Sequence, residues 1–352
     1  MLKKSVLKGN MLEKGVLEKS VPKGSVRKGS LRGKAWGVMG GAMLALACSA
    51  APAAASDPVF TDPGRQLATT GRLKVKQKAV SLPVTQVKWM LHGKFTARGG
   101  VFRGAVSSKE VVSDVDQARV RAIAVALQDD LAAQFRAAGW TVHTRAELGD
   151  NVPDYKPAAP NREAGYPIEA TTTGALKVSY ALVAPEGMPT LLLSGMTGAG
   201  GMGGLQGLGA LGGMAGLAGI NQASFKYARD NPGVTLLVDY GFATAALGET
   251  DSRMLGTEAS PALVLTGGYM AFTANSQSRV NIKDGIEVAQ GIGTLEQMDR
   301  TSTATNVVRY LSGMSTIDKT SYVLTPDWDK VSVEALRAGK AFNAQIVASL
   351  AD

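Results

Sequence analysis

The sequence predicts an α/β or α+β domain, in which helices pack on a mixed β-sheet. Three observations support this prediction: a long amphipathic helix followed directly by a strand, several apolar strand-like segments, and a second amphipathic helix after residue 326. The first helix and its flanking strands form a predicted β-α-β unit near residues 82–148. Such a unit favours at least one parallel pair of strands.

The predicted long helix begins at Ser113. Ser113 and Asp116 have the spacing of a capping box, and Gly139 directly follows the last helical residue, Ala138. Its apolar residues recur at helical spacing and are Val120, Ile123, Leu127, Leu131 and Phe135. We therefore expect one face of this helix to pack on the sheet.

Strands are predicted on both sides of this helix. Residues 82–97 are rich in Val, Thr, Trp and Phe, which favours one long strand or a pair of strands, with a turn at residues 99–100. Residues 140–144 form the strand after the helix. In topology, residues 82–148 resemble the exported α/β domains of curli-secretion-type and TolB-type periplasmic assembly proteins. This resemblance rests on no motif and implies no functional residues.

Three more strands and one helix are predicted later in the chain. The strands cover residues 175–184, 234–240 and 262–274, and the helix begins at Pro326. The strand at 234–240 is expected to be apolar on both faces, as in the middle of a covered sheet. One face of the first strand is expected to carry Leu176, Val178, Tyr180 and Leu182, and an apolar stripe on the helix is expected to consist of Ala335, Ala338, Phe342, Ile346 and Leu350.

Residues 1–55 have the order of a secretory signal peptide. A long basic segment precedes the uncharged residues 35–47, and small residues follow up to Ala55. We expect cleavage between Ala55 and Ser56. Cys48 is an alternative processing site, because a lipoprotein would be acylated there and would begin with this residue.

The remaining chain is expected to begin with an extended leader, residues 56–80. A globular α/β region, residues 81–352, follows it. Two segments are expected to interrupt this region. One is a Pro-rich loop at residues 150–174, and the other is a Gly-rich low-complexity insertion at residues 195–219.

The net charge of +9 belongs mainly to the presequence. Residues 1–55 contain ten Lys or Arg and two Glu, a charge of +8, and the rest has 28 basic against 27 acidic residues, a charge of +1. The expected mature protein therefore has no global positive charge to attract phosphate, and we predict no nucleic-acid partner.

The Gly-rich segment has three interpretations. Residues 198–203 match the dinucleotide fingerprint G-x-G-x-x-G, but glycine at this density is not expected to sustain the helix that the fingerprint needs. Small residues at four-residue spacing would instead let helices approach each other in a membrane. In the third interpretation the segment is a flexible insertion whose Leu and Met side chains form a surface for a partner or for self-association.

No catalytic, cofactor or metal residues are predicted. His92 and His143 lie in the two strands beside the long helix, with no carboxylates at metal-ligand spacing, and are interpreted as structural. Ser194 lacks the surroundings of a nucleophile elbow. The carboxylate pairs at residues 129–130 and 327–329 are interpreted as a solvated helix face and as a helix start.

The sequence therefore favours an exported bacterial protein of the periplasm or outer membrane, which acts through contacts with proteins or with the envelope and is not an enzyme. A periplasmic hydrolase or ligand-binding enzyme is the first alternative. A protein that inserts into membranes or self-associates through the Gly-rich segment is the second.

Overall fold

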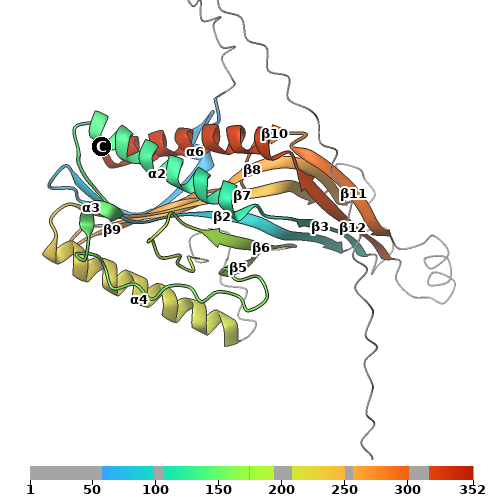
Figure 1. Cartoon of the computed structure of the whole chain (residues 1–352), viewed down its shortest axis with the longest axis horizontal. Coiled ribbons are helices and arrows are strands. Elements are labelled where there is room, and N and C mark those ends of the chain that lie inside the picture. Colours follow the sequence, from blue (N-terminus) through green and yellow to red (C-terminus); the bar gives the residue numbers. More distant parts are fainter. Residues whose placement is uncertain are drawn as a thin grey trace, which may run out of the picture. The chain divides into compact units, whose positions relative to one another are not determined.

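The computed structural model describes residues 58–98, 106–173, 175–193, 208–249, 257–300 and 317–351, all within a compact unit that spans Asp57–Asp352. Residues 1–57, which include Cys48, Ala55 and Ser56, lie outside the described residues. A mixed sheet of twelve strands has helices on both faces, so the predicted fold class is confirmed. Figure 1 shows α2 and α6 on one face of the sheet and α4 on the other.

The strands are β1 (Leu67–Gly71), β2 (Ala79–Arg98), β3 (Val106–Ser113), β4 (Thr141–Thr144), β5 (Ile168–Thr173), β6 (Leu176–Val183), β7 (Val234–Glu249), β8 (Thr257–Phe272), β9 (Gln277–Ile282), β10 (Ile286–Gln290), β11 (Gly293–Arg300) and β12 (Ile317–Pro326). The helices are α1 (Pro63–Gln66), α2 (Gln117–Ala137), α3 (Arg145–Leu148), α4 (Leu208–Asp230) and α6 (Trp328–Ala351).

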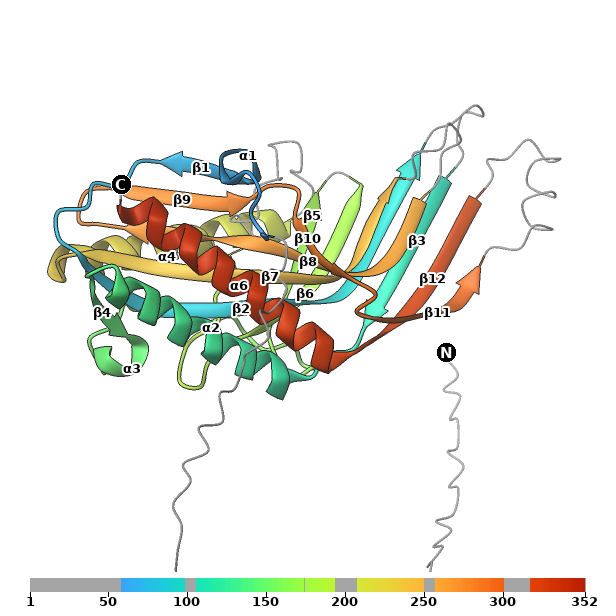
Figure 2. The ribbon, with the colours of Figure 1, turned by 90° about the horizontal axis from the view of Figure 1, so that it is seen from above.

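β2 is the central strand, and its neighbours change along its length. Its first half lies between β4 and β7, which both run parallel to it. Its second half lies between β6 and β3, which both run antiparallel to it. The sheet has the order β1-β9-β8-β7-β2-β3-β12-β11. Because β3 replaces β7 beside β2, the sheet divides there, and Figure 2 shows the β2–β3 and β11–β12 hairpins projecting beyond α6.

Two similar units lie side by side in this arrangement. The β2–β3 hairpin leads into α2, and the β11–β12 hairpin leads into α6. β3 and β12 are parallel neighbours, paired from Val106 and Ile317 to Ser113 and Leu324. The fold therefore contains a strand-strand-helix unit twice, and its two helices start next to each other.

The predicted long helix is α2, but its cap is not the predicted one. Asp116 is the N-cap, and its side chain accepts a hydrogen bond from the backbone N–H of Arg119. Ser113 ends β3 instead, so the predicted capping box is wrong. Gly139 follows the helix with φ +81°, a conformation that suits glycine, as predicted. β3 was not predicted, and the parallel strands β2 and β4 are thus connected through both β3 and α2.

The main core lies between the sheet and the helices α2 and α6. All five predicted apolar residues of α2 and all five of α6 are buried. One buried polar residue joins the layers: Asn343 donates to the backbone oxygen of Leu127 at 3.0 Å and to Asp130 at 2.9 Å, and it accepts a hydrogen bond from the Tyr240 hydroxyl. Asp130 is therefore half-buried between α2 and α6, whereas Asp129 is exposed as predicted.

The opposite face of the sheet is covered by α4. Residues 208–219 of the Gly-rich segment form the first half of this helix, and residues 195–207 lie outside the described part of the chain. The expectation that glycine at this density does not sustain a helix is therefore wrong for residues 208–219. The second half of α4 explains the difference, because Ile220 and Ala228 are buried against the sheet and anchor a cooperative helix.

The two other segments contain strands. In the expected leader, α1 precedes β1, which pairs with β9 at the edge of the sheet. In the expected Pro-rich loop, residues 151–167 have neither helix nor strand, and β5 follows them. Among the helices that are described here, none is both long enough and apolar enough to span a membrane.

Candidate functional site

Successive side chains of β2 point to opposite faces of the sheet, and this alternation places a charged side chain in the middle of one face. Val87 and Trp89 point toward α2 and α6 and belong to the main core. Gln86 and Lys88 therefore point to the opposite face, where Met90 belongs to a separate apolar cluster. A polar band thus interrupts the apolar surface that β2 presents on this face.

Lys88 is the centre of a buried ion triad, which consists of Lys88, Glu169 and Asp239. The Lys88 Nζ lies 2.7 Å from Oδ2 of Asp239 on β7 and 3.3 Å from Oε2 of Glu169 on β5. The side chains of Lys88 and Asp239 are 0% exposed, and that of Glu169 is 2% exposed. The ammonium group also lies 5.7 Å from the ring centroid of Tyr180 on β6. Side chains from four strands, β2, β5, β6 and β7, therefore come together at the Lys88 ammonium group.

The buried surroundings change the pKa values of the triad. Burial acts to lower the pKa of Lys88, but the charges of Asp239 and Glu169 outweigh it, so this pKa is raised. Burial also raises the pKa of Asp239, and the opposing effects of Lys88 and Gln86 are smaller. Lys88 is consequently a permanent cation at neutral pH.

Gln86 fixes the position of Asp239. Its Nε2 donates to Oδ1 of Asp239 at 3.4 Å and to the backbone oxygen of Leu191 at 2.9 Å. Its Oε1 accepts from the backbone N–H of Leu191 at 2.8 Å. The amide of Gln86 is therefore held at both ends, and the carboxylate of Asp239 is oriented by a group that is itself fixed.

A pocket opens beside the triad, where β7 leaves β2. We call it the β6–β7 pocket; its volume is about 250 Å³, and its lining comes from β2, β6, β7, β8, β10 and the turn between β9 and β10. Most of its walls are apolar, including Met90, Val178, Ala245 and Leu247. Tyr180 also lines the pocket, so one aromatic side chain contacts both the pocket and the ammonium group of Lys88.

Glycines on β7 and β8 make room for the polar part of the pocket wall. A Cβ atom on Gly241 would lie 2.1 Å from Oγ1 of Thr266, and one on Gly267 would lie 2.1 Å from the backbone oxygen of Asp239. Gly267 also has φ +103°. Thr266 therefore lies close against β7, and Thr266 and Tyr180 both belong to the pocket wall.

The hydroxyl of Tyr180, a residue of the pocket wall, is neutral. Burial raises the pKa of Tyr180, and the charge of Lys88 and the hydroxyl of Thr266 lower it by less. The hydroxyl is therefore protonated at neutral pH and remains a hydrogen-bond donor. The arrangement suits the binding of a small and mainly apolar molecule rather than proton transfer.

The two histidines are not brought together. His143 on β4 pairs with Ser81 at the start of β2, whereas His92 lies in the second half of β2. The Nε2 of His92 is 2.7 Å from Oε1 of Glu110, and Lys94 donates to the other oxygen of this carboxylate at 3.2 Å. Burial acts to raise the pKa of Glu110, but the hydrogen bonds with His92 and Lys94 together lower it.

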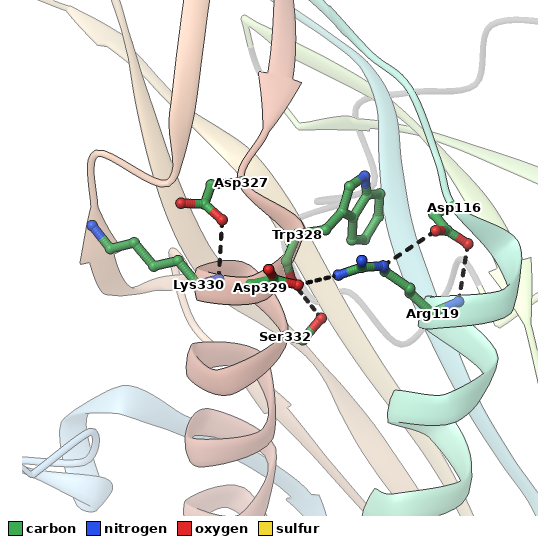
Figure 3. A network of polar contacts seen from close by, with 7 residues as sticks. All are labelled: Asp116, Arg119, Asp327, Trp328, Asp329, Lys330 and Ser332. Carbon is green, nitrogen blue, oxygen red and sulfur yellow. Dashed lines mark hydrogen bonds and ion pairs between the residues drawn. The ribbon is translucent and has the colours of Figure 1, made fainter. Parts of the chain in front are cut away.

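The carboxylates at the start of α6 are structural. Figure 3 shows Oδ1 of Asp327 accepting a hydrogen bond from the backbone N–H of Lys330, at 3.2 Å, as a helix cap does. Asp329 accepts from Nη1 of Arg119 at 2.6 Å, and Arg119 also contacts Asp116. These contacts join the starts of α2 and α6, which agrees with the predicted role of this pair.

Other predicted features contribute no site in the structure. Ser194 and residues 198–203 lie outside the described residues. Within the described part of the chain, no three His, Cys, Asp or Glu side chains are arranged as metal ligands. A second hollow of about 610 Å³ lies near Pro83, Tyr155 and Met188, but it contains no buried ion cluster.

The triad was not predicted from the sequence, although a signal for it exists. Lys88 is a lone charge between Val87 and Trp89, and Asp239 is a lone charge in a strand that was expected to be apolar on both faces. That expectation is wrong at Asp239. A single charge inside each of two apolar strands could have suggested an ion pair across neighbouring strands, but the contribution of Glu169 depends on the fold.

Comparison of the chain with protein-family models, with curated proteins and with solved structures found no match.

Proposed function

We propose that this protein is an exported, non-enzymatic binding protein of the bacterial envelope, and that it holds a small ligand in the β6–β7 pocket. The main support is one observation: a pocket lined mainly by apolar residues, with Tyr180 in its wall, lies next to a buried ion triad with perturbed pKa values. Pockets of this kind, with few polar groups in apolar walls, are typical of ligand sites.

Binding is favoured over catalysis because the ionised groups are enclosed. Lys88 lies behind the ring of Tyr180, and its raised pKa leaves no neutral amine to act as a base or nucleophile. Asp239 already contacts both Lys88 and Gln86. These groups can therefore orient the pocket wall, but they offer no free reactive atom to a substrate.

The triad also gives the pocket a fixed shape. Lys88 links β2 to Asp239 on β7 and to Glu169 on β5, and these strands adjoin the pocket walls. Separating such a buried pair costs about 3–5 kcal/mol, so the strands are held at one spacing. A pre-formed site binds more tightly because little order is lost on binding.

Binding can be tested by filling the pocket. Ala245 is 4% exposed and lines the pocket, so Ala245→Leu places a larger side chain inside it. Ala122 is exposed on α2, and Ala122→Leu is the matched control. Ligand-observed NMR with a mixture of small amphipathic molecules should give broadened signals with the wild type and with Ala122→Leu, and not with Ala245→Leu.

Two results would count against a binding site. One is equal broadening with all three proteins, and the other is broadening with none. Because Ala245→Leu could disturb packing, its urea unfolding must be cooperative and its circular dichroism unchanged. A Val178→Leu variant, which fills the pocket from β6, gives a second measurement at the same site.

Export is proposed from the presequence. Fractionation of the tagged protein with mass spectrometry of its N-terminus tests it: a first residue Ser56 supports signal cleavage, an acylated Cys48 supports a lipoprotein, and an intact Met1 in the cytosol refutes export.

Contact with a protein partner or with a second copy is another candidate function. The uncharged segment 190–225 supports it, and residues 208–219 of that segment extend α4. Because α4 packs on the sheet through residues such as Leu217, a deletion should remove only residues 195–207. An unchanged oligomer size after this deletion, measured by light scattering, would refute a contact role for those residues.

A further inference from the structure

The mouth of the β6–β7 pocket is acidic. Asp284 and Glu287 line it, and both are exposed. Asp284 lies in the tight turn that joins β9 to β10, with φ 54°, and Gly285 follows with φ +78°. Glu287 is the second residue of β10, and its Oε1 accepts a hydrogen bond from Gln290 at 2.6 Å. Two carboxylates are therefore held at the entrance by a turn and a strand.

The turn cannot easily move away from the pocket. A Cβ atom on Gly285 would lie 2.7 Å from Cγ1 of Val264, so the turn packs directly against the pocket wall on β8. Ile286 begins β10 and is buried in the main core. The acidic groups therefore remain beside the opening, and a charge on a bound ligand would meet them there.

Among the described residues that line the pocket, none is Lys, Arg or His, and the acidic ones are Asp284 and Glu287. Lys88 contacts the Tyr180 ring of the wall, and its ammonium group is already paired with Asp239 and Glu169. An anionic ligand would therefore meet two carboxylates without a paired base, whereas a cation would meet complementary charge.

The interior of the pocket determines the size and polarity of the part of the ligand that lies inside it. Leu176, Leu247, Val264 and Met90 provide apolar walls, and a volume of about 250 Å³ is slightly below the usual range for drug-sized molecules. A short aliphatic or small aromatic body fits such a space. Its polar end would face the entrance, because Met90 and Val178 are buried whereas the two carboxylates are exposed.

We propose that the ligand is a small organic amine, with its apolar body between β6 and β7 and its ammonium group beside Asp284 and Glu287. This proposal rests on the proposed binding function and specifies the ligand class. The apolar walls supply affinity, and the acidic entrance selects a cation over a neutral or anionic molecule of the same shape.

Three probes of equal length test this selection: hexylamine, hexanol and hexanoate at pH 7. Titration calorimetry with the protein that lacks residues 1–55 should show binding in the order hexylamine, hexanol, hexanoate. Exposed carboxylates act across screened solvent, so we expect about a 3- to 10-fold preference for hexylamine over hexanol at low salt. The preference should decrease as salt is added, and Ala245→Leu should weaken all three.

The double variant Asp284→Asn, Glu287→Gln removes the two negative charges at the entrance and leaves the apolar walls of the pocket unchanged. It should bind hexanol as the wild type does and should lose the preference for hexylamine. A preference that persists in this variant, or hexanoate that binds as tightly as hexylamine to the wild type, would refute the amine class while the binding function stands. If the wild type binds none of the three at millimolar concentration, the proposed binding function fails as well.

Discussion

Replacing Lys88 with methionine tests whether the buried ion triad is as strong as its geometry suggests. At an effective dielectric constant of about 20, Coulomb's law gives about 6 kcal/mol for the 2.7 Å separation from Asp239 and about 5 kcal/mol for the 3.3 Å separation from Glu169. Dehydration of the ammonium group cancels part of this attraction. The remaining cost of losing one partner of such a buried pair is about 3–5 kcal/mol.

Protonation limits this cost and gives the variant a characteristic pH dependence. Without the ammonium group, Asp239 can take up a proton, which at pH 7 costs about 4 kcal/mol for a carboxyl with an ordinary pKa near 3.9. At pH 5 the same uptake costs about 1.5 kcal/mol. The stability deficit of Lys88→Met should therefore shrink between pH 7 and pH 5.

Urea unfolding of the wild type and of Lys88→Met at both pH values measures the deficit. Arg136→Met is the control, because the Arg136–Glu147 pair is about half exposed, with side-chain accessibilities of 49% and 48%. This control should cost less than about 1 kcal/mol at either pH. A deficit for Lys88→Met below about 1 kcal/mol at pH 7, or one of equal size at pH 5, would refute the strength assigned to the triad.

Three further predictions concern glycines and pH. Gly267→Ala should lower the free energy of unfolding by about 3 kcal/mol or more, because the added Cβ would lie 2.1 Å from a backbone oxygen. Gly139 also has a positive φ, but an added Cβ meets no atom within 4 Å there, so Gly139→Ala should lower the free energy of unfolding by only about 1 kcal/mol. Urea unfolding of the two variants compares them, and equal costs would contradict the crowding. Gly219→Ala in α4 should raise the free energy of unfolding by about 0.5–1 kcal/mol, since an added Cβ meets nothing there; a loss of stability in the same assay would contradict this. Stability should decrease above pH 10, because buried Tyr240 keeps its proton in the folded state while this tyrosine ionises in the unfolded chain. Stability should also decrease below pH 4.5, because the pKa of Glu110 is lower in the folded state. A pH series of unfolding curves without a decrease at both ends would contradict these assignments.

The elements that could be predicted are those whose buried faces are apolar. α6 was predicted because Phe342 and Ile346 recur with its other apolar residues at helical spacing, and all of these residues are buried. β3 was missed because residues 107–110 are two serines, a lysine and a glutamate, with no apolar alternation. Backbone pairing with β2 and β12 on its two sides makes this segment a strand, and a single sequence does not contain that information.

The candidate site could be predicted only in part. Lys88 and Asp239 each interrupt an apolar strand, which is visible in the sequence. Glu169 and Tyr180 reach the site only because the β5–β6 hairpin pairs with the second half of β2. The acidic entrance depends on where the β9–β10 turn packs, and so the pocket follows from pairings between segments that are far apart in the chain.

The side-by-side arrangement of the two strand-strand-helix units affects how early during synthesis the protein can complete its fold. β12 lies next to β3, and α6 completes the core over α2, yet residues 317–351 are synthesised after every other described strand. Contacts between such distant segments form slowly. The core between the sheet and the two helices is therefore expected to be complete only after residues 317–351 have been synthesised.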